Sequence, residues 1–362
     1  MRTIYLVRHG KVEFPGGERS CIGRTDIPLD HIGRLQAMDL GEYFTKHPVE
    51  AVFCSPLCRS KETAAILSGG RFPVREEEKL TELDMGEWEN LPFRELKKVR
   101  SGPEQEPSRG ECRRAGRERM EQAIGGILEE TKGDVAVVSH AGVNCCFLSG
   151  ILGVPLDVSR TLTQPYGGIS RIQVEENGGY QVSDLGRKPG RAPGEAECEE
   201  IWEHYKTPER VRRHCMAVAE TAVRLGNMLS ERQNGPGRDY GSASENPSGL
   251  DLQLIRSAAL LHDVARGCRG HAEEGERILL REGYPETADI IRQHHQLDRE
   301  ILNEAAVVYL ADKLVMEDRE VTLEERFGKS AEKCRDNPEA QAAHQRRYRQ
   351  AERIWRMVFP CE

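Results

Sequence analysis

Short apolar runs, each followed by polar residues and glycine, divide the first half of the chain. Residues 4–7 and 135–138 are apolar at every position, and 49–53 is apolar at four of five. Runs of this length, bounded by turn-forming residues, are typical of buried strands. Strands alternate with helices along this half, and that alternation predicts an α/β domain with a parallel sheet.

The pattern changes near residue 187. Proline, glycine and basic residues dominate 187–194, as is typical of a linker. Beyond it, strand signals vanish and apolar residues recur at helical spacing. The spacing predicts helices over 208–230, 251–266, 272–282, 285–296 and 299–316.

Two segments of the second half are strongly polar. Residues 233–249 are rich in Gly, Ser, Asn and Pro, which predicts a loop. The charged tail 335–353 interleaves acids with bases and predicts a solvated helix. We therefore expect a first domain over 1–186, a linker over 187–198 and an all-helical domain over 199–362.

Composition narrows the class of protein. A chain of 362 residues suits two domains, and no apolar stretch reaches the ~18 residues of a membrane-spanning helix. The start lacks a signal-peptide pattern, and the net charge of -8 argues against a nucleic-acid partner. The 11 cysteines are scattered, which favours free thiols in a reducing compartment over a disulfide framework. We expect a cytoplasmic protein with no membrane or nucleic-acid partner.

Candidate chemistry lies where the strands end. Arg8 and His9 follow the first apolar run, and His140 follows the run 135–138. In open α/β sheets, ligands bind at the carboxyl ends of the strands. Arginine has a fixed charge and a planar fork that suits phosphate, and histidine can be a nucleophile near neutral pH.

Two further residues complete a set for phosphoryl transfer. Ser55 and Pro56 predict a helix start, with serine as N-cap, which places Arg59 about one turn inside the helix. Glu82 is a carboxylate in a loop close to Trp88. Phosphoryl transfer needs arginines for the equatorial oxygens, an attacking histidine and an acid for the leaving oxygen.

These motifs resemble those of the histidine phosphatase superfamily, over residues 1 to about 185. The matching stretches are Leu-Val-Arg-His-Gly at 6–10, Gly-Arg-Thr-Asp-Ile-Pro-Leu at 23–29, 55–59, and Ser-His at 139–140. The resemblance implies a three-layer, phosphoglycerate-mutase-like α/β fold that needs no cofactor, and a small phosphorylated metabolite as substrate.

The resemblance also implies a role for each site residue. His9 becomes phosphorylated, Arg8, Arg59 and His140 bind the phosphoryl group, and Glu82 donates the proton. The short stretch between Glu82 and His140 leaves little room for a large cap, which favours a phosphatase over a mutase.

A second constellation lies in the helical half. His214, the pair His262 and Asp263, and Asp312 interrupt otherwise apolar helices. Buried charges need a partner or a metal, and imidazole with carboxylate suits first-row transition metals. His271 begins one predicted helix, and His294 and His295 end another.

This half resembles the HD-domain metal phosphohydrolases over about 205–320. The matching residues are His214, His262, Asp263 and Asp312, and the resemblance implies that they bind metal. His271 and His294 fit a dinuclear subclass, whereas His295 matches less well. The resemblance implies one or two iron or manganese ions, with a metal-bound water or hydroxide attacking phosphorus.

The two halves together predict a bifunctional phosphohydrolase, with a nucleotide as a candidate substrate of the second domain. Two alternatives stay open. The HD domain could bind a nucleotide without cleaving it and so regulate the phosphatase, or the first domain could be a phosphoglycerate mutase.

Overall fold

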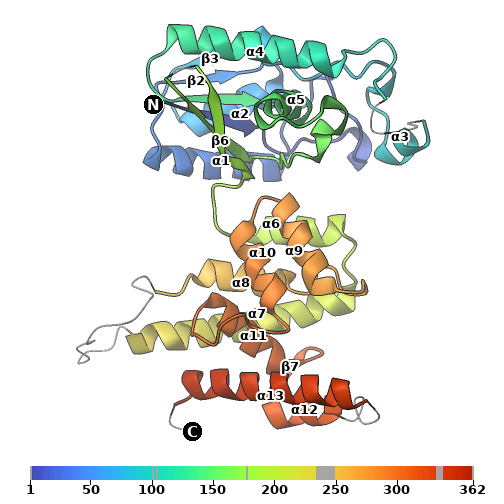
Figure 1. The fold of residues 1–362 in the computed structure, drawn as a ribbon, viewed down its shortest axis with the longest axis vertical. Coiled ribbons are helices and arrows are strands. Elements are labelled where there is room, and N and C mark those ends of the chain that lie inside the picture. The colour runs from blue at the N-terminus through green and yellow to red at the C-terminus, as the bar shows by residue number, and fades with distance from the viewer. Residues whose placement is uncertain are drawn as a thin grey trace. The chain divides into compact units, whose positions relative to one another are not determined.

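The computed structural model of the 362-residue chain describes residues 2–99, 102, 105–176, 178–233, 249–331 and 337–360. Two compact units divide the chain close to residue 190. The first holds a sheet with helices on both faces, and the second is built mostly from helices (Figure 1). The α/β class expected for the first half and the helical class expected for the second are thereby confirmed.

The first unit contains six strands and five α-helices among its described residues. The strands are β1 (Arg2–Arg8), β2 (Ala51–Cys54), β3 (Val74–Glu76), β4 (Val135–Ser139), β5 (Ile169–Val174) and β6 (Tyr180–Arg187). The helices are α1 (His31–Lys46), α2 (Cys58–Ser68), α3 (Phe93–Val99), α4 (Arg113–Glu130) and α5 (Ala141–Leu152).

The sheet is mixed, with strand order β3-β2-β4-β1-β5-β6. Strands β1 to β4 are parallel, whereas β5 runs antiparallel to both β1 and β6. The expected parallel sheet is therefore confirmed for β1 to β4, whereas β5 departs from it. The short connection between β5 and β6 accounts for the antiparallel pairing of those two strands, because consecutive strands without a crossover pair antiparallel.

Strand β1 shows how the three layers are held together. Its residues 4–7 are all buried, and successive side chains point to opposite faces. Ile4 and Leu6 pack in the core beneath α4 and α5, whereas Tyr5 and Val7 pack against α1 and α2. Figure 1 shows α4 and α1 on opposite faces of the sheet. A continuous apolar run is thus what a strand covered on both faces requires.

The register of β1 against β4 positions the candidate site. Arg8 pairs with Ser139 in the parallel ladder, and the His9 amide donates to the Ser139 carbonyl at 3.0 Å. The residues that follow, His9 and His140, therefore leave the sheet side by side.

The second unit contains eight α-helices and one small hairpin among its described residues. The helices are α6 (Glu195–His204), α7 (Glu209–Gln233), α8 (Leu252–Leu261), α9 (His271–Arg281), α10 (Pro285–Gln293), α11 (Glu304–Lys313), α12 (Leu323–Ala331) and α13 (Pro338–Val358). The hairpin strands are β7 (Val315–Met316) and β8 (Arg319–Glu320).

Several helix ends differ from the sequence prediction. Helix α8 stops at Leu261 rather than 266, because tight turns follow, in which the Arg266 amide donates to the Asp263 carbonyl. Helix α11 begins at Glu304 rather than 299, where the Asn303 side chain caps it. In both cases a turn or cap ends a helix that apolar spacing alone would continue.

Two predicted segments need separate comment. Helix α6 begins at Glu195, inside the stretch 187–198 where a linker was expected, and residues 188–194 have neither helix nor strand. The loop expected over 233–249 lies, apart from its first and last residues, outside the described residues.

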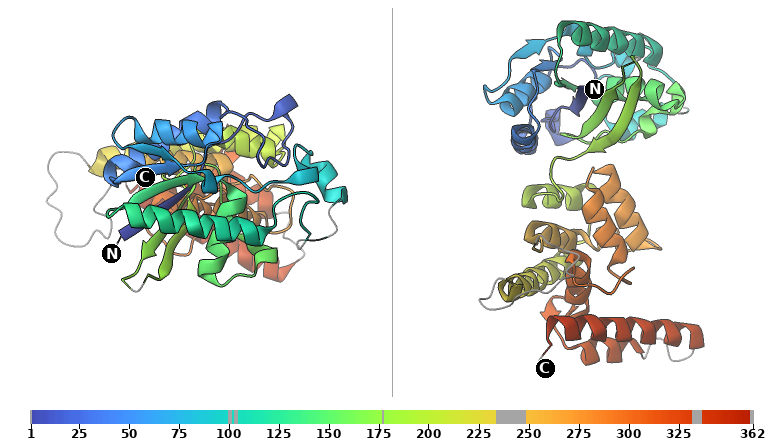
Figure 2. Two further views of the ribbon diagram at one scale, coloured as in Figure 1. Left: turned by 90° about the horizontal axis from the view of Figure 1, so that it is seen from above. Right: turned by 60° about the vertical axis from the view of Figure 1, so that its left-hand side comes forward.

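The described part of the charged tail is helical from Pro338, but it is not wholly solvated. Ala351 of that tail is buried in the core of the unit, as are Ile354 and Val358 just beyond it in α13. Figure 2 shows α12 and α13 side by side, and the two helices are in contact. Within the described part of the chain, no helix is long and apolar enough to cross a membrane.

Candidate phosphoryl-transfer site and metal centre

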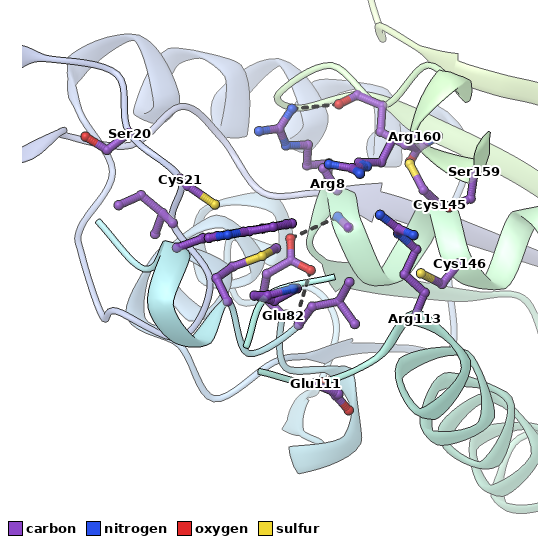
Figure 3. Close-up of a pocket in the computed structure, with 18 of the residues that line it drawn as sticks. Arg8, Ser20, Cys21, Glu82, Glu111, Arg113, Cys145, Cys146, Ser159 and Arg160 are labelled. Atoms are coloured by element: carbon purple, nitrogen blue, oxygen red, sulfur yellow. Dashed lines mark hydrogen bonds between the residues drawn. The ribbon is translucent and has the colours of Figure 1, made fainter. Parts of the chain in front are cut away.

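The carboxyl ends of β1 and β4 open into a pocket of about 390 Å³. Arg8, His9, Arg59 and Glu82 line it, whereas His140 is fully buried behind it. Figure 3 shows Arg8 and Glu82 among the lining side chains. The structure thus brings together all five residues that the sequence singled out in this half.

His9 is held as a neutral imidazole with one nitrogen free. Its Nδ1 lies 2.7 Å from the Gly10 carbonyl oxygen, which can only accept, so Nδ1 carries the proton. Burial, followed by the charges of Arg59 and Arg8, holds the pKa of His9 well below its ordinary value of 6.5. At neutral pH, Nε2 therefore has a lone pair, as a nucleophile requires.

His140 lies against His9, with 5.0 Å between the ring centroids. Its Nε2 is 2.8 Å from the Ser55 hydroxyl oxygen, while its buried Nδ1 has no hydrogen-bond partner among the described residues. Burial and the neighbouring His9 hold the pKa of His140 well below 6.5. When the Ser55 hydroxyl donates to Nε2, the proton of this neutral ring is on Nδ1, which can then donate to an anion.

Ser55 does not play the local role that the sequence predicted. Helix α2 begins at Cys58 with Leu57 as its N-cap, and the Ser55 hydroxyl accepts a hydrogen bond from the Leu57 amide. The contact between Ser55 and His140 therefore replaces the predicted capping role. Arg59 is consequently the second residue of the helix rather than one turn inside it.

Backbone carbonyls hold both arginines in place. Arg59 is only 1% exposed and donates to the carbonyls of Gly23, at 2.6 Å, and Thr25, at 2.8 Å. Arg8 donates to the Gln164 carbonyl at 2.7 Å, and its guanidinium carbon lies 3.5 Å from the Tyr166 ring centroid. Arginines preorganised in this way can neutralise a phosphoryl group with little loss of side-chain entropy.

Glu82 is anchored by the start of helix α5. Its Oε1 accepts from the amides of Leu83 and Val143, and its Oε2 accepts from the Gly142 amide, all at 2.9 Å. A carboxylate at a helix N-terminus also interacts favourably with the helix dipole. Glu82 therefore has a structural contact in addition to its predicted chemical role.

The pocket contains residues that sequence reasoning missed. Arg113 and Arg160 add two more cations, and Tyr166 packs 5.7 Å from the His9 ring. Phe93 and Leu96 add to the apolar wall that Trp88, already noted beside Glu82 in the sequence, contributes. These residues lie in no recognisable motif, so no local signal marks them.

The thiols in and near the pocket are unsuited to nucleophilic chemistry. Burial raises the pKa of Cys145 and of Cys146 to about 12, and that of Cys54 to about 11. These thiols stay protonated at neutral pH, and only the thiolate is an effective nucleophile.

The second unit assembles a cluster around two buried carboxylates. Asp263 lies beside four imidazoles, with Nε2–Oδ distances of 3.9 Å to His214, 3.5 Å to His262, 3.1 Å to His271 and 3.7 Å to His294. Asp312 Oδ1 lies 3.3 Å from His214 Nε2 and 3.6 Å from His262 Nε2. The structure therefore brings together all six predicted metal ligands.

The imidazoles of this cluster are oriented by the backbone. Nδ1 of His214, His262 and His294 contacts the carbonyls of Glu317, Ala259 and Ile291 respectively, at 2.6 to 2.7 Å. In the neutral form of each ring, Nδ1 therefore carries the proton and Nε2 faces the cluster. Burial opposes protonation of His262, but Cys215 and Asp263 hold its pKa well above 6.5, so a metal bound at its Nε2 would displace a proton.

The donor set fits a metal ion. Nε2 of His262 and Nε2 of His294 are buried without hydrogen-bond partners among the described residues. Burial opposes ionisation of Asp312, but Lys313, His214 and His262 hold its pKa well below the ordinary range. Charged carboxylates facing free imidazole nitrogens are what a transition-metal site offers.

His295 belongs to this cluster more closely than the sequence indicated. Its Nε2 lies 2.9 Å from Nε2 of His271, and nitrogens of His271, His294 and His295 lie within 4.8 Å of one another. His214, His262 and Asp263 form another such group, and each of the two groups could hold a metal ion.

Comparisons with known proteins cover both halves. The model of the histidine phosphatase superfamily (branch 1) matches residues 4–185, and that of the HD domain matches residues 211–317. Probable phosphoglycerate mutases GpmB of Klebsiella pneumoniae and Salmonella choleraesuis are 31% and 32% identical to this chain over 188 residues. Each match covers 49% of this chain and 87% of the relative.

Solved structures similar to the first half include Bacillus stearothermophilus YhfR, at 28% identity and a TM-score of 0.47, covering 51% of this chain and 96% of that one. Another is a putative alpha-ribazole-5'-P phosphatase from Escherichia coli, at 24% identity and a TM-score of 0.46, covering 52% and 97%. The matched family model spans half of the chain, and the described geometry agrees with it. The chain belongs to the histidine phosphatase superfamily, branch 1, and carries an HD domain after its phosphatase domain.

Proposed function

We propose that this protein is a bifunctional phosphohydrolase whose first domain hydrolyses a phosphomonoester through a phosphohistidine at His9. The observation that carries the proposal is the state of His9. It is a neutral imidazole with Nε2 free, and it lies beside His140, Arg8 and Arg59 at the edge of the sheet.

The reaction has two steps. His9 Nε2 attacks phosphorus, the bond from phosphorus to the ester oxygen breaks, and Glu82 protonates the departing alkoxide. Water then attacks the phosphohistidine and gives its proton to Glu82, the N–P bond breaks, and phosphate leaves. Arg8, Arg59 and His140 stabilise the charge on the equatorial oxygens in both steps.

The lining of the pocket favours a phosphatase over a mutase. Trp88, Phe93 and Leu96 give one side an apolar surface, which matches a phosphomonoester with an apolar body. A three-carbon acid phosphate, the substrate of a phosphoglycerate mutase, would leave this surface uncovered. The substrate class we propose is therefore a small metabolite that carries one phosphate and an apolar group.

For the second domain we propose metal-dependent hydrolysis of a phosphoester. His214, His262, Asp263, His271, His294 and Asp312 would hold one or two ions, with iron and manganese as our candidates. The bound metal would supply an activated water and neutralise developing charge. The complete donor set supports hydrolysis over purely regulatory binding.

The limits of the two domains and the compartment of the protein are also proposals. We propose domains over 1–186 and 199–362, joined by 187–198. We also propose the cytoplasm as the compartment, since six cysteines are buried as free thiols: Cys21, Cys54, Cys145, Cys146, Cys198 and Cys215.

A screen of phosphorylated metabolites with and without a chelator tests both activities. We expect a chelator-insensitive phosphatase whose activity His9→Ala abolishes, together with acid-labile incorporation of phosphate. His31→Ala, at an exposed position on α1, is the control and should retain both. Full phosphatase activity in His9→Ala would refute the phosphohistidine.

A further inference from the structure

A second cavity, of about 690 Å³, opens beside His214 and Asp263. Its walls come from the start of α7, the turn after α8, the β7–β8 hairpin and α12. Five cationic side chains line it, together with three carboxylates, those of Asp263, Glu317 and Asp318; the cations are Arg210, Arg213, Arg266, Arg326 and Lys329. A volume of this size lies within the range of sites for small organic molecules, roughly 300–1,000 Å³.

The cations form two groups. Arg266 pairs with Asp263, and Arg326 lies 3.8 Å from Oδ1 of Asp312, so these two reach the metal cluster itself. Arg210, Arg213 and Lys329 are exposed and make no ion pair or side-chain hydrogen bond in the described structure. Cations therefore extend from the cluster outward and outnumber the carboxylates in the lining, and within the described residues the outer three are not paired with Glu317 or Asp318.

Such an arrangement favours a ligand with several negative charges. Like charges gathered in one cavity repel each other and raise the local potential, which attracts anions. A single phosphate at the cluster could contact Arg266 and Arg326, but it would leave the outer three cations unused. A chain of phosphates would extend along them.

The cavity offers little to a nucleobase. Among the described residues that line it, none is Phe, Tyr or Trp, and Val211 and Met316 are the apolar ones. Stacking on aromatic side chains is a common way to hold a base, so a base would gain little here. Recognition by charge is the feature that these walls provide.

We propose that this cavity binds an oligophosphate, a chain of at least two phosphate groups, with one end at the metal cluster and the rest along Arg210, Arg213 and Lys329. The proposal rests on the proposed function of the second domain and narrows its substrate class. It predicts that free oligophosphate and the same phosphate chain attached to a nucleoside bind with similar affinity, because the cavity does not recognise the attached nucleoside.

Titration calorimetry on the full-length chain tests this with orthophosphate, pyrophosphate, inorganic triphosphate and a nucleoside triphosphate. We expect affinity to rise at least tenfold from orthophosphate to triphosphate and to fall with added salt. The nucleoside triphosphate should bind within about threefold of inorganic triphosphate. Much tighter binding of the nucleoside form would overturn recognition by charge alone.

A combined variant, Arg210→Gln with Arg213→Gln and Lys329→Gln, supplies the matched test. Each exposed charge contact is worth about two- to fivefold, so the variant should bind triphosphate roughly tenfold or more weakly. Its metal content should stay unchanged, because none of the three is a proposed ligand. Arg224→Gln is the control: Arg224 lies on α7, pairs with Glu320 outside this cavity, and should bind like the wild type.

The outcomes separate this proposal from that of the hydrolase. The substitutions lie in the second unit, so the affinity that they change reports on this cavity and not on the pocket of His9. If the protein preferred triphosphate but never took up metal, the oligophosphate site would be supported, and the proposed metal-dependent hydrolysis by the second domain would be refuted. Metal-dependent hydrolysis with equal affinity for orthophosphate and triphosphate, or an unaltered combined variant, would overturn the oligophosphate site.

Discussion

Replacing Glu82 with glutamine separates its chemical role from its structural one. The carboxylate accepts three backbone N–H groups, from Leu83, Gly142 and Val143. A glutamine keeps one acceptor oxygen but turns an NH₂ group toward one of these donors. The unsatisfied N–H costs about 1–3 kcal/mol, and the lost charge at the start of α5 costs about 0.3–1 kcal/mol more. Glu82→Gln should therefore lower the free energy of unfolding by about 1–4 kcal/mol.

The catalytic effect should depend on the leaving group. General acid catalysis contributes about 10²- to 10⁴-fold, so kcat/KM for an alkyl phosphate should fall by that factor in Glu82→Gln. At 1.36 kcal/mol per tenfold, this is about 3–5 kcal/mol of transition-state stabilisation. An aryl phosphate with an acidic phenol needs little protonation and should lose less than about tenfold.

Steady-state kinetics on both substrates, with urea unfolding alongside, provide the measurement. Glu78→Gln, exposed and four residues upstream, is the control and should change neither quantity. Gly142→Ala gives an independent check, because its added Cβ would lie 2.7 Å from Glu82 Oε1 and displace the carboxylate without removing it. Equal loss on both substrates in Glu82→Gln would show that Glu82 only supports the fold.

Four further predictions follow from the described contacts. Since the pKa of His9 lies well below 6.5, the chelator-insensitive kcat/KM should not fall between pH 7.5 and about 6, and an acid limb with an apparent pKa of 6.5 or above would contradict this. Below pH 6.5 the His9 side chain takes up a proton in the unfolded chain but not in the folded one. The free energy of unfolding should therefore fall as the pH falls, by at most about 1.4 kcal/mol per pH unit from this group. Comparison of the pH dependence of unfolding with that of a His9→Asn variant measures this contribution. Arg59→Lys should cost about 100-fold or more in kcat/KM, because an ammonium cannot keep the carbonyls of Gly23 and Thr25 while also reaching the phosphoryl oxygens; a loss under about threefold would count against the clamp. Asp263→Ala should abolish bound metal in elemental analysis and chelator-sensitive hydrolysis while sparing His9-dependent activity, with the exposed Asp289→Ala as control, and metal retained at the wild-type level would refute the proposed ligand set.

Much of the fold could be predicted because the signals are local. Successive side chains of a strand point to opposite faces of the sheet. Because all four residues of the run 4–7 are apolar, both faces of this strand must be covered if the four side chains are to be buried. Strand-end positions also placed Arg8, His9 and His140 at the correct edge of the sheet. Helix boundaries were less accurate, as at Leu261, because turns and caps depend on contacts that periodicity does not encode.

The candidate sites could be predicted as residues but not as geometry. Motifs pointed to His9, His140, Asp263 and Asp312, whereas nothing local indicated that His295 would lie 2.9 Å from His271. That proximity arises only when α9 and the end of α10 pack together.

The sequence by itself determined the two fold classes and the residue types available for chemistry, because apolar spacing and motifs are read within a few positions of the chain. Only the tertiary structure decided the protonation states and the surroundings of those residues. The tautomer of His140 depends on Ser55, 85 positions away, and the cationic cavity joins Arg213 of α7 to Lys329 of α12. Contacts of that kind depend on how distant elements pack, which no local pattern encodes.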